Sequence, residues 1–222
     1  MRLLIVNPNS TQAMTDAVAR IAVEAAPAGV AIVARTSLSG PPAIQGAEDG
    51  EAAIPGLLAE IAKGRAEGFD AAIVACFDDT GLAEARAAFG GPVLGIGQAA
   101  FHAAALLGGR FSVVTTLAVS IPVIEGNLIA CGLAASCARV RASGVPVLAL
   151  EADPTATERV AAEIARAQAE DGVAAVALGC AGMGALADAL RARLSAQLGP
   201  GAPHLVDGVR AAVRLAPALV GL

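Results

Sequence analysis

Short apolar runs alternate with alanine-rich stretches along the whole chain, and this alternation restricts the fold more than any other feature. Eight runs rich in Val and Ile have the length of strands: residues 3–6, 31–34, 71–75, 93–96, 112–115, 138–141, 173–178 and 204–206. Between them, apolar residues recur every three or four positions, as at Met14, Val18 and Ile21, which is typical of helices. Strands that alternate with helices predict an α/β fold with parallel sheets covered on both faces.

The two halves of the chain repeat one another. "RLLIVNPNST" opens the first half and "RFSVVTTLAVS" the second, and each leads through helix, strand and helix to an apolar strand that ends on a cysteine. Cys76 lies 72 residues after Leu4, and Cys180 lies 66 residues after Val114. We therefore predict two pseudo-symmetric lobes, each a mainly parallel four-stranded sheet flanked by helices. Residues 1–98 with 208–222 are expected to form one lobe, and residues 99–207 the other.

The composition excludes several classes of partner. The chain has 222 residues, with 15 basic and 20 acidic side chains and no stripe of Lys or Arg, which argues against nucleic acid and anionic membranes as partners. Although 56% of the residues are hydrophobic, Gly90, Gly91 and Pro92 interrupt the uncharged window 87–109, so it does not predict a membrane span. The apolar run at residues 3–6 is too short for a secretion signal. We expect a cytoplasmic protein with reduced thiols and a small-molecule substrate.

Cys76 and Cys180 stand in matching positions, each between an apolar strand and a turn that begins a helix. The surrounding segments are "VACFDDTGL" at residues 74–82 and "VALGCAGMG" at residues 176–184. The dipole and free amides of a helix start favour the thiolate, so we expect the pKa of each thiol to fall from about 8.5 towards neutrality. Two facing thiols can remove a proton from a carbon and return one to its opposite face, which inverts a stereocentre without a cofactor. The alternative is that each cysteine is an inert small hydrophobe.

The loops at the predicted carboxyl ends of central strands carry neutral donors. Residues 7–11, 76–80, 115–120 and 180–184 contain no Lys or Arg, which suits a carbonyl or enolate oxygen better than a phosphate. Thr115 and Thr116 are either strand formers or a carbonyl clamp. Of Asp78 and Asp79, one is expected to cap the helix that follows. The functional alternative is that one of them accepts a substrate N–H.

The remaining cysteines and the histidines do not form a recognisable site. Cys131 and Cys137 lie outside turns with free amides, and we assign them to packing. The chain has no Cys-x-x-Cys, and His102 and His204 lack ligand spacing to any cysteine. We therefore expect no metal site.

"GIGQAA" at residues 95–100 matches a dinucleotide-binding fingerprint. The fingerprint expects an acidic residue about 20 positions later, but the next acidic residue is Glu125, and the preceding strand is not the first of the sheet. We interpret Gly95 and Gly97 instead as positions of tight turning and close packing.

Five motifs in order, "VNPNST", "CFDDTGL", "GIGQAAFH", "SVVTTL" and "LGCAGM", resemble those of the hydantoin racemase group of the aspartate/glutamate racemase superfamily. The resemblance covers nearly the whole chain. It implies two α/β lobes with the active site in the cleft between them, and racemisation without a cofactor. It also implies that Cys76 and Cys180 are the two acid/base residues. The substrate-binding residues that it implies are Asn9, Ser10, Phe77, Asp78, Thr115, Thr116, Ala181 and Gly182.

The sequence departs from the amino-acid racemases of this superfamily at two dipeptides. Those enzymes typically carry Asn-Thr after the first cysteine and Thr-His or Thr-Glu after the second, whereas Phe77-Asp78 and Ala181-Gly182 follow here. This argues against an amino-acid substrate, and our leading hypothesis is racemisation of 5-monosubstituted hydantoins. The alternatives are an allantoin racemase, an amino-acid racemase, a decarboxylase or isomerase that uses one thiol, and a small-molecule binding protein. The apolar segment 101–107 leads us to expect a homo-oligomer.

Overall fold

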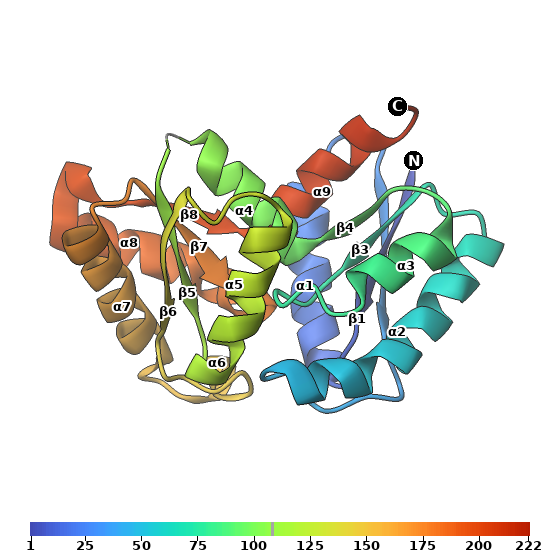
Figure 1. The fold of residues 1–222 in the computed structure, drawn as a ribbon, viewed down its shortest axis with the longest axis horizontal. Helices are drawn as coiled ribbons and strands as arrows, with labels where there is room; N and C mark the ends of the chain where they lie inside the picture. Colours follow the sequence, from blue (N-terminus) through green and yellow to red (C-terminus); the bar gives the residue numbers. More distant parts are fainter. Residues whose placement is uncertain (108) are drawn as a thin grey trace.

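The computed structural model describes residues 1–107 and 109–222 and contains two four-stranded parallel sheets (Figure 1). The strands are β1 (Arg2–Asn7), β2 (Ala31–Thr36), β3 (Ala71–Val74), β4 (Val93–Gly95), β5 (Phe111–Thr115), β6 (Cys137–Ala142), β7 (Ala175–Gly179) and β8 (His204–Asp207). Each predicted strand is present. The predicted α/β fold, with two similar lobes, is confirmed.

The two sheets have the same topology. Their strand orders are β2-β1-β3-β4 and β6-β5-β7-β8, and every pairing is parallel. Leu4 of β1 pairs with Ala72 of β3, and Val114 of β5 pairs with Leu178 of β7. The strands that lead to the two matched cysteines, β3 and β7, therefore occupy equivalent interior positions.

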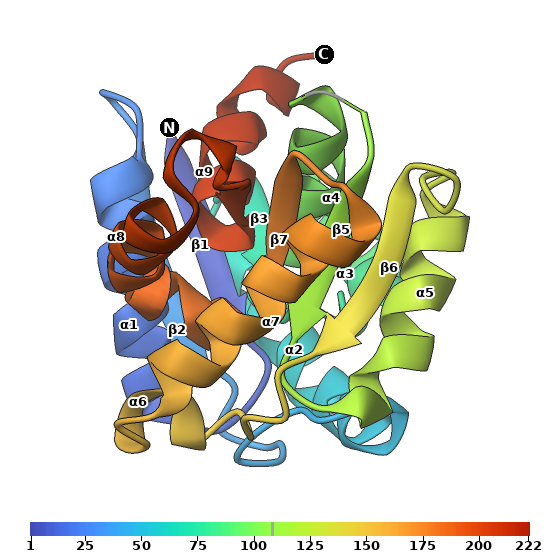
Figure 2. The same ribbon diagram turned by 90° about the vertical axis from the view of Figure 1, so that its left-hand side faces the viewer.

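Helices cover both faces of each sheet. They are α1 (Gln12–Ala25), α2 (Ala47–Ala66), α3 (Leu82–Phe89), α4 (Ile96–Leu106), α5 (Ile121–Ala130), α6 (Ala149–Ala152), α7 (Ala156–Asp171), α8 (Ala187–Leu198) and α9 (Gly208–Leu219). Helices α2 and α3 pack on one face of the first sheet, and α7 and α8 on one face of the second, where Figure 2 shows them in front. The helices α1, α4, α5 and α9 pack on the other faces, between the sheets.

Strand periodicity divides the apolar interior into three cores. Leu3 and Ile5 of β1 join a central core that also contains Val113 of the second sheet. Leu4 and Val6, which point to the other face of β1, join the outer core of the first lobe. The second lobe has its own outer core beneath α7 and α8. Because the central core includes side chains of both lobes, it holds the two sheets together.

Helices α4 and α9 cross between the lobes. Helix α4 follows β4 of the first sheet but packs on β7 and β8 of the second, and α9 follows β8 but packs on β3 and β4 of the first. They meet where Gly208 approaches Ile96 so closely that a Cβ at Gly208 would overlap with the Ile96 carbonyl oxygen. The lobe boundaries expected from the sequence stay a prediction. None of the described helices combines the length and apolarity that a bilayer crossing needs.

Three phenylalanines connect the lobes inside the central core. The ring of Phe101 on α4 meets that of Phe77 edge to face, with centroids 5.4 Å apart, and lies nearly parallel to that of Phe111 at 6.4 Å. Phe77 follows β3 and Phe111 begins β5, so one aromatic ring contacts both halves of the chain.

The substitution Phe101→Ala is expected to lower the free energy of unfolding by about 3–5 kcal/mol, because it leaves a cavity at a fully buried position. Leu106→Ala is the matched control on the same helix. The Leu106 side chain is 83% exposed, so its loss should change stability by less than about 0.5 kcal/mol. Urea unfolding followed by circular dichroism measures both variants. Equal losses would contradict a central role for the Phe101 ring.

Candidate active site

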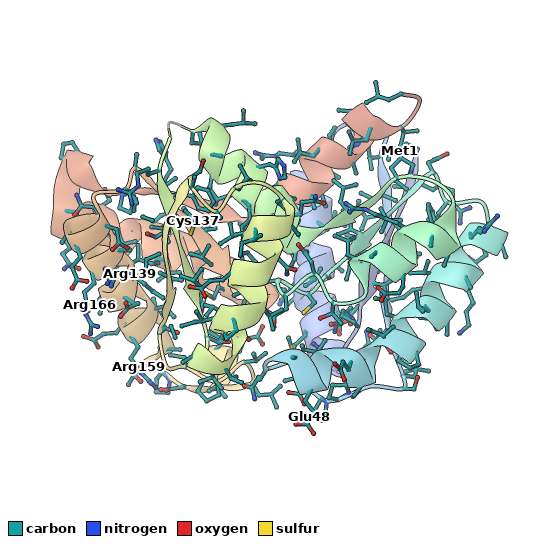
Figure 3. The ribbon with its side chains drawn as sticks, in the orientation of Figure 1. Met1, Glu48, Cys137, Arg139, Arg159 and Arg166 are labelled. Carbon is teal, nitrogen blue, oxygen red and sulfur yellow. The ribbon has the colours of Figure 1, made fainter. Side chains whose placement is uncertain are left out.

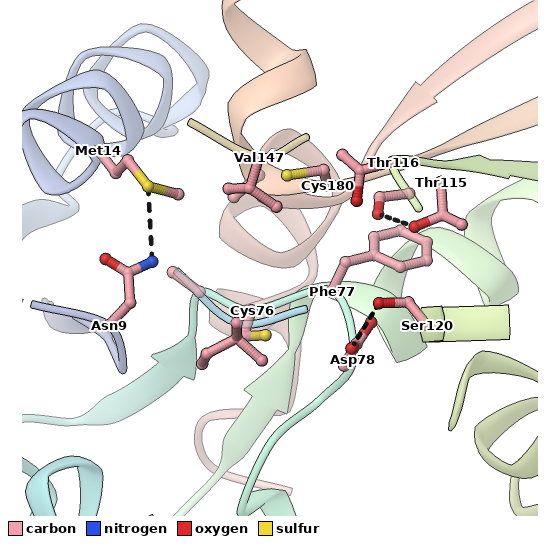
Figure 4. A pocket seen from close by; sticks show the side chains of 14 residues that line it. Asn9, Met14, Cys76, Phe77, Asp78, Thr115, Thr116, Ser120, Val147 and Cys180 are labelled. Carbon is pink, nitrogen blue, oxygen red and sulfur yellow. Dashed lines mark hydrogen bonds between the residues drawn. The ribbon is translucent and has the colours of Figure 1, made fainter. Parts of the chain in front are cut away.

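Two cysteines from different lobes reach one cavity. Cys76 lies two residues beyond the end of β3, and Cys180 directly follows β7. Both thiols line the same cavity, and Figure 4 shows them on opposite sides of it. The topology explains this meeting, because the carboxyl ends of two parallel sheets with the same strand order face each other between the lobes.

The cavity gathers most of the residues that were expected to bind a ligand. It is lined by Asn9, Met14, Ile44, Ala75, Cys76, Phe77, Asp78, Thr115, Thr116, Ser120, Val147, Gly179, Cys180 and Ala181. Eight of the ten expected site residues are in this set, and Ser10 and Gly182 are not. The backbone N–H of Ser10 donates to the Pro41 carbonyl at 3.0 Å. The Met183 backbone N–H donates to the Cys180 carbonyl at 3.0 Å, and the Gly182 and Met183 amides lie near enough to the Cys180 thiol to lower its pKa. Gly182 therefore lies beside the thiol but does not line the cavity.

Several lining residues were not expected from the sequence. Met14 belongs to the apolar face of α1, and Ser120 ends a short 3-10 turn (Ala118–Ser120). The sequence pattern around each of them could therefore have indicated its position near the site. Ile44 and Val147 come from loops that show no periodic pattern. They reach the cavity only because the two lobes bring those loops together.

The loops of Ile44 and Val147 meet beside the cavity. The Val147 backbone N–H donates to Oε1 of Gln45 across the two lobes at 3.1 Å. The cavity volume is about 30 Å³, which holds one or two water molecules and is too small for a five-membered ring. A ring-shaped ligand therefore requires a wider cavity than the one in this structure.

Asn9 presents a hydrogen-bond donor to the cavity. Its Oδ1 atom accepts from Nδ2 of Asn7 at 2.9 Å and from the Thr11 backbone N–H at 3.0 Å. Its Nδ2 atom lies 3.6 Å from the Met14 sulfur, as Figure 4 shows. Because the amide oxygen is already bound, the NH₂ group is the part of Asn9 that can receive a ligand carbonyl.

The two threonines at the end of β5 differ in their hydrogen bonds. The Thr115 hydroxyl donates to the Gly179 carbonyl at 2.9 Å and so ties β5 to β7. Among the described residues, the Thr116 hydroxyl has no protein partner. Of the pair, Thr116 has the freer hydroxyl for a ligand.

Burial controls the ionisation of both cavity thiols. It raises the pKa of Cys76 far above its ordinary value, and the neighbouring Asp78 carboxylate raises it further. Burial also raises the pKa of Cys180 to about 11, although the Gly182 and Met183 amides act against this. The lowered thiol pKa expected from the helix starts is therefore wrong for this closed cavity, because desolvation of the thiolate outweighs the effect of the amides.

Asp78 is the charged group of the cavity. Burial raises the pKa of its carboxyl to about 6, while hydrogen bonds from the Ser120 hydroxyl and the Gly46 backbone lower it. The Ser120 Oγ to Asp78 Oδ2 distance is 3.1 Å, and Nδ2 of Asn127 donates to the Asp78 carbonyl at 2.8 Å. Two residues of the second half of the chain, Ser120 and Asn127, thus fix the position of Asp78.

Asp79 points away from the cavity and caps a helix other than the expected one. Helix α3, which follows it, begins after Gly81 without a side-chain cap. The Asp79 carboxylate instead accepts from the backbone N–H groups of Gly97 and Gln98, at the start of α4. The expectation that an aspartate of this pair caps the following helix is wrong, because the loop turns the carboxylate towards α4.

Gly95 and Gly97 confirm the interpretation as close-packing positions. A Cβ at Gly95 would overlap with the Asp79 carboxylate, and a Cβ at Gly97 would overlap with the Phe77 carbonyl oxygen. These glycines make room for the loop that carries Cys76.

The other cysteines and the histidines lie outside the cavity. Cys131 and Cys137 are half-buried and pack against the central core, as expected, and Figure 3 shows Cys137 on β6. His102 and His204 are exposed. No group of three or more His, Cys, Asp or Glu residues within residues 1–107 and 109–222 is arranged to hold a metal ion.

Comparison with known proteins agrees with the fold and with the resemblance in sequence. A model of the Asp/Glu/Hydantoin racemase family matches residues 3–216. The hydantoin racemase of Rhizobium meliloti is 45% identical over 100% of this chain and 89% of its own length. The hydantoin racemase of Pseudomonas sp. (strain NS671) is 38% identical over 100% of this chain and 87% of its own length.

A solved structure agrees as closely. The allantoin racemase from Klebsiella pneumoniae superposes with a TM-score of 0.92 at 39% identity, covering 99% of this chain and 87% of that one. Since the family model and relatives more than 30% identical span nearly the whole sequence, the chain belongs to the Asp/Glu/Hydantoin racemase family.

Proposed function

We propose that this protein racemises 5-monosubstituted hydantoins at C5 with Cys76 and Cys180 as its two acid/base residues. The observation that carries the proposal is that the two thiols line one cavity from opposite sides. The hydantoin racemases that match the whole chain support the choice of substrate.

The reaction needs one thiolate and one thiol. The thiolate of one cysteine removes the proton from C5, whose acidity comes from the adjacent carbonyl, and becomes a thiol. The resulting enolate is planar at C5, and the opposite thiol delivers a proton to its other face and becomes the thiolate. The pair ends with the same number of protons as it began, and its titration belongs to both cysteines together.

Neutral donors and one carboxylate hold the ring. We assign the Asn9 amide and the Thr116 hydroxyl, which both line the cavity, to the ring carbonyl oxygens. The carbonyl oxygen next to C5 gains negative charge in the enolate. We assign to Asp78 the role of accepting a ring N–H. Such a bond compensates the buried carboxylate, which otherwise opposes the formation of a nearby thiolate.

The same mechanism defines the surroundings that the enzyme requires. It uses no cofactor, because both the base and the acid are cysteine side chains. The two thiols must stay reduced, which fits the predicted cytoplasmic location, and the four cysteines of the chain are free. The expected homo-oligomer remains part of the proposal, since Leu106 and Leu107 at the end of α4 are exposed.

Allantoin racemisation is the second candidate, favoured by the structural match to the allantoin racemase from Klebsiella pneumoniae. Polarimetry with a panel of 5-substituted hydantoins, allantoin, aspartate and glutamate distinguishes these reactions. A binding protein on the same scaffold would show no turnover with any of them, and alkylation of its thiols would leave ligand affinity unchanged.

The variants Cys76→Ser and Cys180→Ser are each expected to racemise a 5-substituted hydantoin about 10²–10⁴-fold more slowly, because each lacks one proton-transfer group. Deuterium incorporation at C5 in heavy water is followed for each enantiomer. Exchange of a single enantiomer that survives in one variant identifies the thiol that serves it. Cys131→Ser is the matched control and should keep full activity. The mechanism is wrong if both cavity variants racemise as fast as the parent.

The substitution Asp78→Asn is expected to shift the pH dependence of Cys76 alkylation about one pH unit lower, because it removes a negative charge that raises the pKa of this thiol. Alkylation by iodoacetamide is read separately for each cysteine by peptide mass spectrometry, so the result does not depend on turnover. Asp188→Asn is the control, since the Asp188 side chain is 89% exposed. An unchanged Cys76 profile in Asp78→Asn would show that this carboxylate does not act on the thiol.

A further inference from the structure

Asp79 is joined to Cys76 through a tight turn. Its backbone N–H donates to the Cys76 carbonyl at 3.0 Å. Asp79 is also the one non-glycine residue with positive φ among the described residues, at 49°, a left-handed conformation that is uncommon for L residues but that Asp adopts more readily than most. A movement of Asp79 therefore changes the position of the Cys76 backbone.

The Asp79 side chain fixes that turn to the start of α4. Its Oδ1 atom accepts from the Gly97 N–H at 2.9 Å, and its Oδ2 atom accepts from the Gln98 N–H at 2.7 Å. The residue at the N-cap position, Gly95, has no side chain to do this. The Asp79 carboxylate thus replaces a missing local cap. It fits there because Gly95 has no Cβ that would overlap with it.

Helix α4 carries this connection to the opposite thiol. The helix packs on β7, and Cys180 directly follows β7. The turn of one cysteine is therefore linked, through two hydrogen bonds and one helix, to the strand that positions the other cysteine.

The second lobe caps its crossing helix without using its cysteine loop. Asp207, at the end of β8, is the N-cap of α9 and accepts from the N–H groups of Val209 and Arg210 at 2.8 and 3.1 Å. Met183 stands three residues after Cys180, where Asp79 stands after Cys76. A cap at the end of the preceding strand is therefore enough to start a helix of this kind. The start of α4 does not need a cap from the cysteine loop for its stability alone.

We propose that Asp79 is a positioning residue. By fixing the Cys76 turn to α4, it holds the Cys76 thiol at the correct position relative to the Cys180 thiol. This inference rests on the proposed two-thiol function. It predicts that Asp79 affects proton transfer by Cys76 far more than proton transfer by Cys180.

A double substitution separates positioning from helix stability. In Asp79→Gly with Gly95→Asp, the cap moves to the strand end, as in the second lobe. The backbone allows this, because Gly95 has φ −91° and ψ 144° and Asp207 has φ −86° and ψ 122°, and glycine suits the positive φ at position 79. The double variant should regain the thermal stability that Asp79→Gly loses. Should it fail to fold, Asp79→Asn, which keeps the side-chain size but replaces one acceptor by a donor, tests the same point.

The readout is C5 deuterium exchange in two single-thiol backgrounds. With Cys180→Ser, where Cys76 acts alone, the double substitution should slow exchange by about 10- to 100-fold, since a displacement of about 1 Å can have this effect. With Cys76→Ser, where Cys180 acts alone, exchange should change by less than about twofold. Equal effects in the two backgrounds, or no effect in either, would overturn the positioning role.

Alkylation distinguishes failure of this inference from failure of the proposed function. If the parent protein itself exchanges no deuterium at C5 of any tested hydantoin, the proposed function is wrong. The position of the turn is still measured, because the double variant should alkylate Cys76 several-fold faster than the parent and leave the rate at Cys180 unchanged. An unchanged alkylation rate at Cys76 overturns the inference in that case as well.

Discussion

The close crossing of α4 and α9 is the constraint on which the rest of this structure depends. Gly208 lets the start of α9 approach the Ile96 carbonyl at the start of α4, and each helix then packs on the sheet of the other lobe. The carboxyl ends of β3 and β7 consequently face each other across a short distance. A shared cavity with a thiol on each side follows from this arrangement.

Burial gives the cavity a limited capacity for charge. It raises the pKa of both thiols and of the Asp78 carboxyl, because each would place a negative charge in a poorly solvated space. Few negative charges are stable there at one time. A reaction that keeps one thiolate and one thiol at every stage suits such a site, and a substrate that donates an N–H to Asp78 makes the thiolate easier to form.

The sequence predicted most of the fold but less of the site. Strand runs, helical spacing and the duplication are local patterns, so the sheets and the matched cysteines could be recognised. Ile44 and Val147 come from loops without a periodic pattern. The backbone N–H of Gly97, which donates to the Asp79 carboxylate, lies 18 residues further along the chain, at the start of α4. The direction of the thiol pKa changes was also missed, because it depends on how deeply the folded chain buries each sulfur, and motif context does not reveal this. The catalytic and binding roles assigned to the cavity residues stay predictions.

The exchange of helices between lobes also sets an order for assembly during synthesis. The strands of the first sheet are complete once residue 95 has been made, but α9, which covers part of that sheet, is the last helix of the chain. The lobe that leaves the ribosome first is therefore finished only later, and β3 and β4 keep exposed apolar surface until α9 (Gly208–Leu219) has been made. Loss of the C-terminal segment would leave the N-terminal half prone to aggregation, although every residue of its own sheet is intact.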